Sequence, residues 1–306
     1  MQKLTLSKDD WQNQINKHQF ILKPYLEPHL QRRHAGIKHP VYDFLFDYYP
    51  FRPAQLNYWT PGIMVILEHA VFTNSFWQRY GKKVGTGLEM NLAKFPRTRL
   101  PFLIWGKNYL IETQKRAPFW GCFGLHEWAM LYNSQQPKHP QLQMRVSPKI
   151  LEEVILKYTL VCTHFDAYRF FTPQSIPLNR YSLSRDSSVE FDQSGCLHVN
   201  MDLYKMAFKL YPWCSSELIR EAFELAWFGR EIDMRASPYD LRDFGFEPIE
   251  IETETGLQDY LRMQQEIHSR GKPIRGRLIN LYSILIETIN KSNPIGMTIS
   301  LSQIGD

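Results

Sequence analysis

The sequence predicts a mainly α-helical protein that folds as a single compact domain over residues 1–306, with few or no short strands. Apolar residues recur at helical spacing in several long segments, and helix-capping residues stand at the starts of three of them. No Ser/Gly-rich linker, low-complexity tract or internal repeat divides the chain. Hydrophobic residues make up 43% and aromatic residues 14% of the sequence, enough to form a buried core and to exclude a disordered protein.

The first predicted helix begins after Ser7, because Asp9 and Asp10 favour a helix N-terminus. Its apolar stripe continues toward Arg33 through Trp11, Ile15 and Leu22. The next helix begins at Ser147 and Pro148, an N-cap and first-turn pair, and runs to Tyr158. Two short apolar runs, residues 63–67 and 158–162, fit a strand or a helix equally well.

The C-terminal half adds more helices. One begins at Ser216, and its apolar positions are Leu218, Ala222, Phe223, Leu225 and Ala226. Residues 255–289 are predicted to form two helices, interrupted near Gly271-Lys272-Pro273, because glycine and proline disfavour a helix interior. The second of these carries Leu278, Leu281, Ile284, Leu285 and Ile289 at helical spacing.

Several classes of protein are excluded by simple features of the sequence. The longest uninterrupted apolar run, residues 63–67, is far shorter than the roughly 20 residues of a membrane span. Residues 1–10 contain no apolar core of a secretory signal, and the four cysteines have no paired spacing. We therefore expect a cytoplasmic protein with no membrane partner, and we see no sign of an obligate protein partner.

Charge is unevenly distributed along the chain, although the formal net charge is only +5. Residues 78–116 contain nine basic and two acidic residues, whereas residues 217–260 contain twelve acidic and four basic residues. Two hypotheses follow. Both segments form ordinary solvated faces, or the basic segment contacts phosphate or another anion. The glycine-rich stretch GKKVGTG (residues 81–87) is predicted to be a flexible loop and a weak anion-binding candidate.

Four histidines in polar segments that are rich in aromatic residues each lie within four residues of a carboxylate. The pairs are His39 with Asp43, His126 with Glu127, His164 with Asp166, and His198 with Asp202. A carboxylate that accepts from one ring nitrogen fixes the histidine tautomer and leaves the other nitrogen to bind metal or transfer a proton. A structural hydrogen bond would explain any one of these histidines, but the four together favour a shared functional site.

These segments supply the candidate site residues. The catalytic candidates are His126, Glu127, His164 and Asp166. The candidate metal ligands are His126, His164, His198 and Asp202, and a histidine and carboxylate set suits iron, zinc or manganese.

Arginine in an aromatic context needs an anionic partner, so the substrate-binding candidates are Arg52, Arg169 and Arg185, together with Trp128. Internal carboxylates such as Asp186 and Asp240 are the alternative partners of these arginines. The two glycines of residues 121–124 (GCFG) predict a tight turn beside His126.

The same segments resemble a bacterial family labelled 3-methyladenine DNA glycosylase. The matching strings are HPVYDFLFDYYPFRPAQL (39–56), GCFGLHEWAMLY (121–132), HFDAYRFFTP (164–173), GCLHVNMDLYK (195–205), DMRASPYDL (233–241) and PIEIETETG (248–256). They span most of the chain. The resemblance implies a DNA-repair hydrolase that cleaves the N-glycosidic bond of a damaged base in DNA or in a related nucleoside.

Three functions therefore remain open. In the first, a base enters an aromatic pocket, and Asp166 or Glu127 activates water or stabilises the developing cation. In the second, the histidines and carboxylates bind a divalent metal ion in an oxygenase or hydrolase that acts on a small molecule. In the third, the protein binds a ligand without catalysis. Helical DNA glycosylases carry a glycine-rich helix-hairpin-helix, and this sequence contains none. The metal-enzyme hypothesis therefore remains open beside the glycosylase hypothesis.

Overall fold

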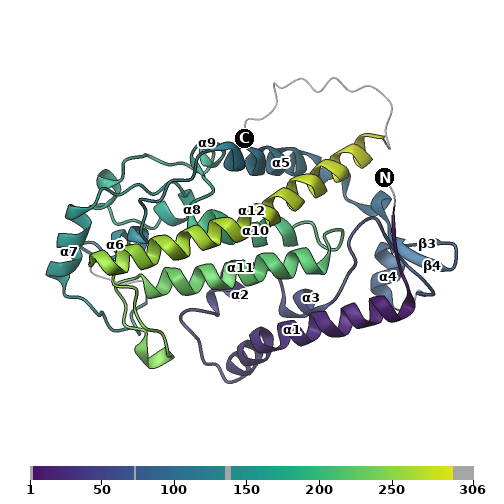
Figure 1. The fold of residues 1–306 in the computed structure, drawn as a ribbon, viewed down its shortest axis with the longest axis horizontal. Coiled ribbons are helices and arrows are strands. Elements are labelled where there is room, and N and C mark those ends of the chain that lie inside the picture. The colour runs from purple at the N-terminus through teal and green to yellow at the C-terminus, as the bar shows by residue number, and fades with distance from the viewer. Residues whose placement is uncertain (1–2, 72–73, 135–138, 292–306) are drawn as a thin grey trace.

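Three helices, α10 (Leu197–Phe208), α11 (Ser216–Arg235) and α12 (Glu254–Lys291), pack together in the centre of the computed structural model (Figure 1). This structure describes residues 3–71, 74–134 and 139–291. It is 58% helical, so the prediction of a mainly α-helical fold with few short strands is confirmed. Helix α5 (Leu100–Lys115) lies against α12 on the other side of that helix from α11 (Figure 1).

The remaining elements surround these central helices. The other α-helices are α1 (Lys8–His34), α2 (Phe44–Tyr48), α3 (Pro53–Asn57), α4 (Ser75–Tyr80), α6 (Leu125–Ala129), α7 (Pro148–Lys157), α8 (Phe165–Tyr168) and α9 (Ser188–Phe191). Short 3₁₀ helices are η1 (Leu92–Lys94), η2 (Arg97–Arg99), η3 (Ile176–Leu178) and η4 (Arg242–Phe244).

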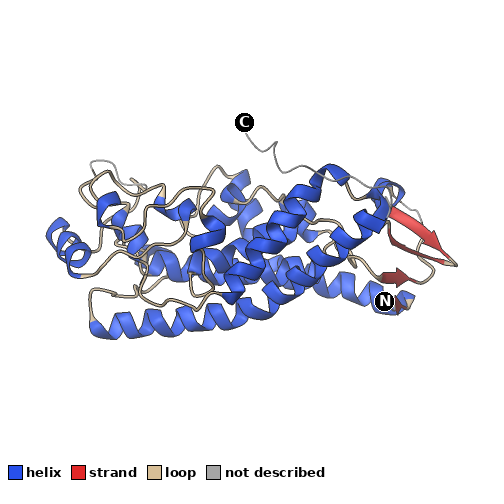
Figure 2. Ribbon diagram, turned by 90° about the horizontal axis from the view of Figure 1, so that it is seen from above, coloured by secondary structure: helices blue, strands red, loops and turns tan. Residues whose placement is uncertain are grey.

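A small sheet lies at one end of the molecule (Figure 2). Its strands are β1 (Leu4–Leu6), β2 (Val65–Leu67), β3 (Gly81–Val84) and β4 (Gly87–Met90), in the order β1-β2-β4-β3. β1 pairs with β2 in parallel, and the other two pairings are antiparallel. The GKKVGTG stretch, predicted to be a loop, is therefore most of the β3–β4 hairpin. Its turn depends on Gly85, whose φ of +55° suits glycine.

Helix starts follow the sequence signals closely. Ser7 caps α1 by accepting a hydrogen bond from the backbone N–H of Asp10, and Ser147 caps α7 through the N–H of Ile150. The helix predicted to begin at Ser216 is α11, which is capped one residue earlier by Ser215. All five apolar positions predicted for that helix are buried.

The prediction of two helices over residues 255–289 was wrong, because α12 is continuous through Gly271 and Pro273. Gly271 packs so closely on α10 that a Cβ built there would lie 2.1 Å from Oδ1 of Asn200. The glycine therefore permits close helix packing and does not end the helix. Pro273 lies on the exposed side, where the lost backbone hydrogen bond is tolerated within a long packed helix.

The core is one connected set of buried hydrophobic side chains that extends from Leu22 in α1 to Ile289 in α12. Helix α10 is at its centre, since ten of its twelve residues are buried. Polar residues on such a helix need partners inside the protein. Both His198 and Asp202 belong to α10, so the fold places them where their side chains must interact with other elements.

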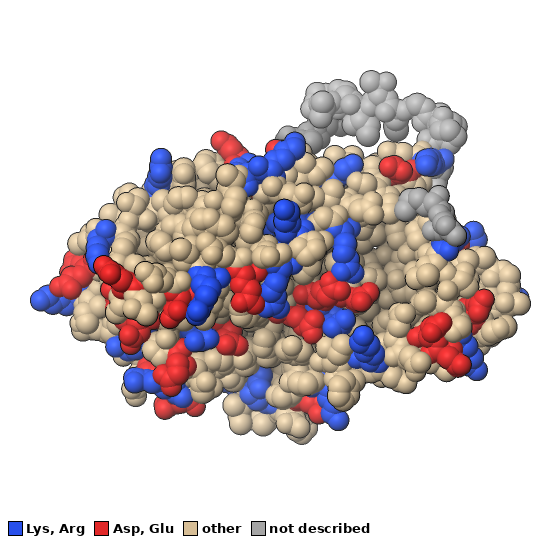
Figure 3. Space-filling model, in the orientation of Figure 1, with Lys and Arg blue, Asp and Glu red and all other residues tan. Residues whose placement is uncertain are grey.

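Charged side chains are mixed on the face shown in Figure 3, where Lys and Arg alternate with Asp and Glu. This face therefore carries no extended area of one sign. In the part of the chain that the structure describes, no helix combines the length and apolar character that a bilayer-spanning helix requires.

Candidate active site

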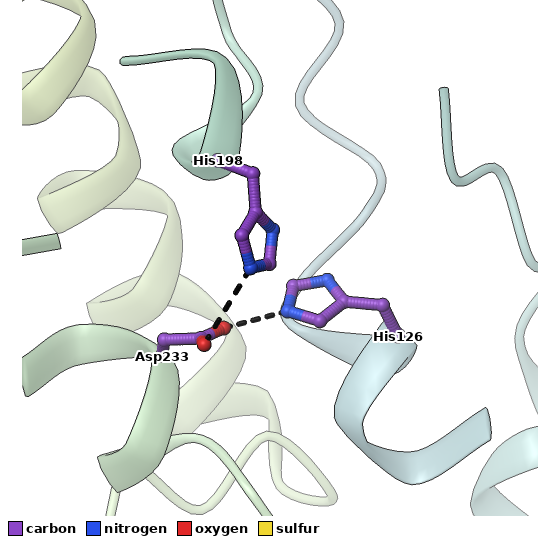
Figure 4. A group of neighbouring side chains, drawn as sticks. All are labelled: His126, His198 and Asp233. Carbon is purple, nitrogen blue, oxygen red and sulfur yellow. Dashed lines mark hydrogen bonds and ion pairs between the residues drawn. The ribbon is translucent and has the colours of Figure 1, made fainter. Parts of the chain in front are cut away.

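His126, His198 and Asp233 meet in the interior, and both imidazole rings point toward the carboxylate (Figure 4). Nε2 of His126 lies 2.6 Å from Oδ1 of Asp233, and Nε2 of His198 lies 3.7 Å from Oδ2. One ligand atom from each residue lies within 4.8 Å of the other two. We call these three residues the His126 cluster. A single ion could bind all three side chains after small rearrangements.

Three elements build the His126 cluster. His126 belongs to the fully buried helix α6, His198 to the first turn of α10, and Asp233 to the last turn of α11. Helix α6 begins after a tight turn, as the GCFG segment predicted, in which Phe123 and Gly124 have φ values of +45° and +73°. A backbone in this region is unfavourable for phenylalanine, so the surrounding packing holds the turn that aims His126.

The charges in the His126 cluster are closely balanced. Burial alone would raise the pKa of Asp233, but the neighbouring His126, His198 and Arg230 hold it below its ordinary value. Burial likewise opposes protonation of His126, yet Asp233 and the adjacent Cys122 raise the pKa of His126 well above its ordinary value. Burial, with the positive charges of its neighbours, lowers the pKa of His198 to about 3. His198 is therefore neutral near pH 7 and offers a lone pair to a cation.

A second group, His164, Asp166 and Asp202, lies next to the first, and we call it the His164 cluster. The rings of His164 and His198 are parallel, with centroids 5.5 Å apart. Nε2 of His164 lies 4.0 Å from Oδ2 of Asp202. The two clusters thus form one continuous polar region in the interior.

The carboxylates of the His164 cluster have several partners within the protein. The Tyr48 hydroxyl donates to Asp166, and the Tyr49 hydroxyl donates to Asp202, each at 3.0 Å. Lys205 donates to Asp202, and its Nζ also lies 3.6 Å from Asp166. Burial opposes a charge on Lys205, but these two carboxylates raise its pKa. The Lys205 ammonium therefore already occupies a cation position between Asp166 and Asp202.

Two cavities meet at the His164 cluster. The small cavity, of about 180 Å³, is lined by aromatic side chains together with His198, Glu127 and Arg230. The large cavity, of about 690 Å³, lies beside Lys205. His164, Asp166 and Asp202 line both cavities. His198 connects the small cavity with the His126 cluster.

His164 and Asp166, which are close in the sequence, come together in the His164 cluster, but the pairs expected at His126 and His198 do not form as predicted. His126 pairs with Asp233, and Glu127 lies 3.8 Å from Arg230. His198 faces Asp233, although Asp202 stands four residues later on the same helix. The predicted metal set His126, His164, His198 and Asp202 is thus divided between the two clusters.

The pair of His39 and Asp43 lies elsewhere. Asp43 accepts from the His29 ring, from the Arg32 side chain and from the backbone N–H of His39. The His39 ring accepts from backbone N–H groups of Val41 and Tyr42. These two residues therefore hold the loop between α1 and α2 through local hydrogen bonds, and neither is part of the two clusters.

The predicted substrate-binding residues are scattered. Arg52 is exposed and lines a separate hollow together with His29 and Asp43. Arg169 lies 3.2 Å from Asp166, and Arg185 lines the large cavity. Trp128 is fully buried and donates to the Ala236 carbonyl, so it is a core residue that lines neither cavity. Asp186 lines the large cavity next to Arg185, and Asp240 bonds Arg242.

Sequence reasoning missed Asp233 and Asp192. Asp233 is separated from His126 by more than one hundred residues, so no local spacing relates them. A signal did exist, since Asp233 follows Ala222 and Ala226 on the buried stripe of α11, where a carboxylate is unexpected. Asp192 is buried in the loop after α9, where it accepts from the Tyr109 hydroxyl and lies 3.3 Å from Nδ1 of His164.

Comparison with protein-family models, with curated protein sequences and with solved structures finds no match for this chain. The two clusters and the cavities beside them are therefore the features of this chain that bear on its function.

Proposed function

We propose that this protein is a metal-dependent enzyme in which His126, His198 and Asp233 bind one divalent metal ion. The observation that supports this most directly is the convergence of two imidazoles and one carboxylate from three separate helices. Two histidines and one carboxylate form the ligand set of many iron, zinc and manganese enzymes. The cation takes the place of the proton held between His126 and Asp233.

Charge balance favours one ion over two. The His126 cluster and its neighbour Glu127 contribute two carboxylates against the single guanidinium of Arg230, so a cation improves the balance there. The two carboxylates of the His164 cluster already face Lys205 and Arg169. A second divalent ion would leave uncompensated positive charge in a buried region, which is costly.

Three protein ligands leave positions at the ion for water and for an oxygen of the substrate. Glu127 lines the small cavity and is placed to accept a proton from such a water, while Arg230 faces developing negative charge. Phe44, Tyr48 and Phe170 line the same cavity and suit a small substrate with a planar part. The proposed reaction is hydrolysis with zinc or manganese, or oxidation of the substrate by dioxygen with iron.

Hydrolysis of an N-glycosidic bond is the second candidate. It is supported by the stacking of Phe44 on Tyr48, with ring centroids 4.9 Å apart, in the cavity that also contains Glu127 and Asp166. An aromatic wall beside carboxylates suits a nucleobase leaving group. The mixed charge on the face in Figure 3 favours a nucleoside over duplex DNA on that face.

Elemental analysis of the purified chain separates the two candidates. We expect about one iron, zinc or manganese ion per chain and its loss in His198→Ala, with His34→Ala, an exposed histidine at the end of α1, as the matched control. Circular dichroism of each variant verifies folding. A metal-free protein that releases base from alkylated DNA or from a nucleoside would instead support the second candidate. A folded protein with neither property would overturn both.

A further inference from the structure

The large cavity beside the His164 cluster has a different character from the small one. Its deep part contains buried acidic residues, among them Asp192, which is 1% exposed. These carboxylates have internal donors: Asp192 accepts from Tyr109, and Asp166 and Asp202 face Lys205. Lys205 and Arg169 therefore offset the negative charges of Asp166 and Asp202, and Asp192 lies beside His164, 3.3 Å from Nδ1 of its ring.

The outer part of the large cavity is more basic. Arg185 and Lys209 are both exposed, and among the described residues neither forms an ion pair with a carboxylate. Asp186 adds one negative charge beside Arg185. Burial and the positive charges of Lys205 and Arg99 lower the pKa of Lys209, so the surroundings of this amine favour an added anion.

An aromatic surface borders the same opening. Trp105 in α5 is 43% exposed and lines the large cavity. It stacks on Tyr109 with ring centroids 5.3 Å apart and an interplanar angle of 10°. Phe102 lies one helical turn before Trp105 in α5. The amine of Lys209 lies 5.0 Å from the centre of the Phe102 ring. A planar ring can therefore stack beside fixed positive charge.

We propose that the large cavity binds a planar substrate that carries a phosphate monoester, with the ring on Trp105 and the phosphate between Lys209 and Arg185. This inference rests on the proposed function, because a substrate bound in this way directs its reacting end past the His164 cluster to the metal ion. Two cations suit a dianionic phosphate, and the cavity of about 690 Å³ is large enough for a mononucleotide.

Isothermal titration calorimetry with adenosine 5′-monophosphate and adenosine tests this assignment. We expect the monophosphate to bind at least about tenfold more tightly than adenosine, because a charge-assisted hydrogen bond to its phosphate contributes about that much affinity. Lys209→Met should remove that preference, and Trp105→Ala should weaken both ligands. Lys149→Met is the matched control, because Lys149 is an exposed lysine on α7 that lines neither cavity.

Metal content is measured on the same samples. Equal binding of the two ligands by the wild-type chain, or an equal loss in Lys149→Met and Lys209→Met, would overturn the phosphate assignment even if the metal is present. Phosphate preference in a chain that binds no metal would overturn the proposed function and leave the phosphate site standing. Lys209→Met with unchanged metal content and lost phosphate preference is the result that supports both.

Discussion

The three histidines of the site, His126, His164 and His198, differ in the side chains that surround them. His126 lies against Asp233 and Cys122, His164 against Asp192, and His198 between the other two rings. The pKa of His126 and of His164 is raised by the carboxylates, whereas the pKa of His198 is lowered to about 3. The neutral histidine is also the one that lines the small cavity beside the His126 cluster, which favours its role as a metal ligand.

Lys205 limits the site to one ion, in our proposal, because its ammonium lies between two carboxylates that a second ion would need. We expect Lys205→Met to raise the metal content from about one ion per chain toward two in elemental analysis. Lys209→Met, four residues later at the C-cap of α10, is the control and should remain at one ion. Two ions in the wild-type chain, or no change in Lys205→Met, would contradict this prediction.

At the scale of the element, close packing of α12 on α10 determines where the candidate ligands lie. Asn200 is two residues after His198, and its side chain donates to the carbonyls of Ser194 and Cys196 and accepts from Arg275. Gly271 provides the space that Asn200 occupies. The glycine that sequence reasoning took for a helix end therefore helps to position the start of α10.

Gly271→Ala should destabilise the protein by about 1–3 kcal/mol, since the new methyl group overlaps an Asn200 side chain that its hydrogen bonds hold in place. Gly276→Ala, five residues later in the same helix, meets no atom within 4 Å. It should stabilise the protein by about 0.5–1 kcal/mol through helix propensity. Urea unfolding of both variants measures the difference, and equal effects at the two positions would refute this account.

Across the whole molecule, the candidate ligands come from the consecutive helices α10 and α11 and from α6, which is distant from both in sequence. His126, His198 and Asp233 come from α6, α10 and α11, so an ion bound by all three connects separate parts of the chain. A ligand that binds only the folded state stabilises it by an amount that grows with the logarithm of the free ligand concentration relative to Kd.

Metal should therefore raise the melting temperature of the wild-type chain by several degrees. At a free ion concentration of 100 times Kd the expected gain is about 2.7 kcal/mol. Scanning calorimetry with and without a chelator measures the shift, and His198→Ala should show none. A chelator that leaves the melting temperature of the metal-loaded wild type unchanged would rule out a metal ion bound only in the folded state.

Features of this fold that depend on interactions between neighbouring residues could be predicted from the sequence. Features that depend on contacts between residues far apart in the chain could not. Ser7 and Ser147 mark helix starts because capping is local, and those starts are confirmed. The partners of His126 and His164 escaped prediction because Asp233 and Asp192 reach them only through tertiary packing. The continuity of α12 was not predicted for the same reason, because Gly271 permits close packing against Asn200, a residue far away in the sequence.

The distance along the chain between His126 and Asp233 has a consequence for biosynthesis. The His126 cluster cannot assemble until the last turn of α11 has left the ribosome, by which time most of the polypeptide has been made. A nascent chain shorter than this presents two histidines without their carboxylate. In our proposal, the metal ion can therefore bind only after the last turn of α11 has been made, late in translation or after release of the chain.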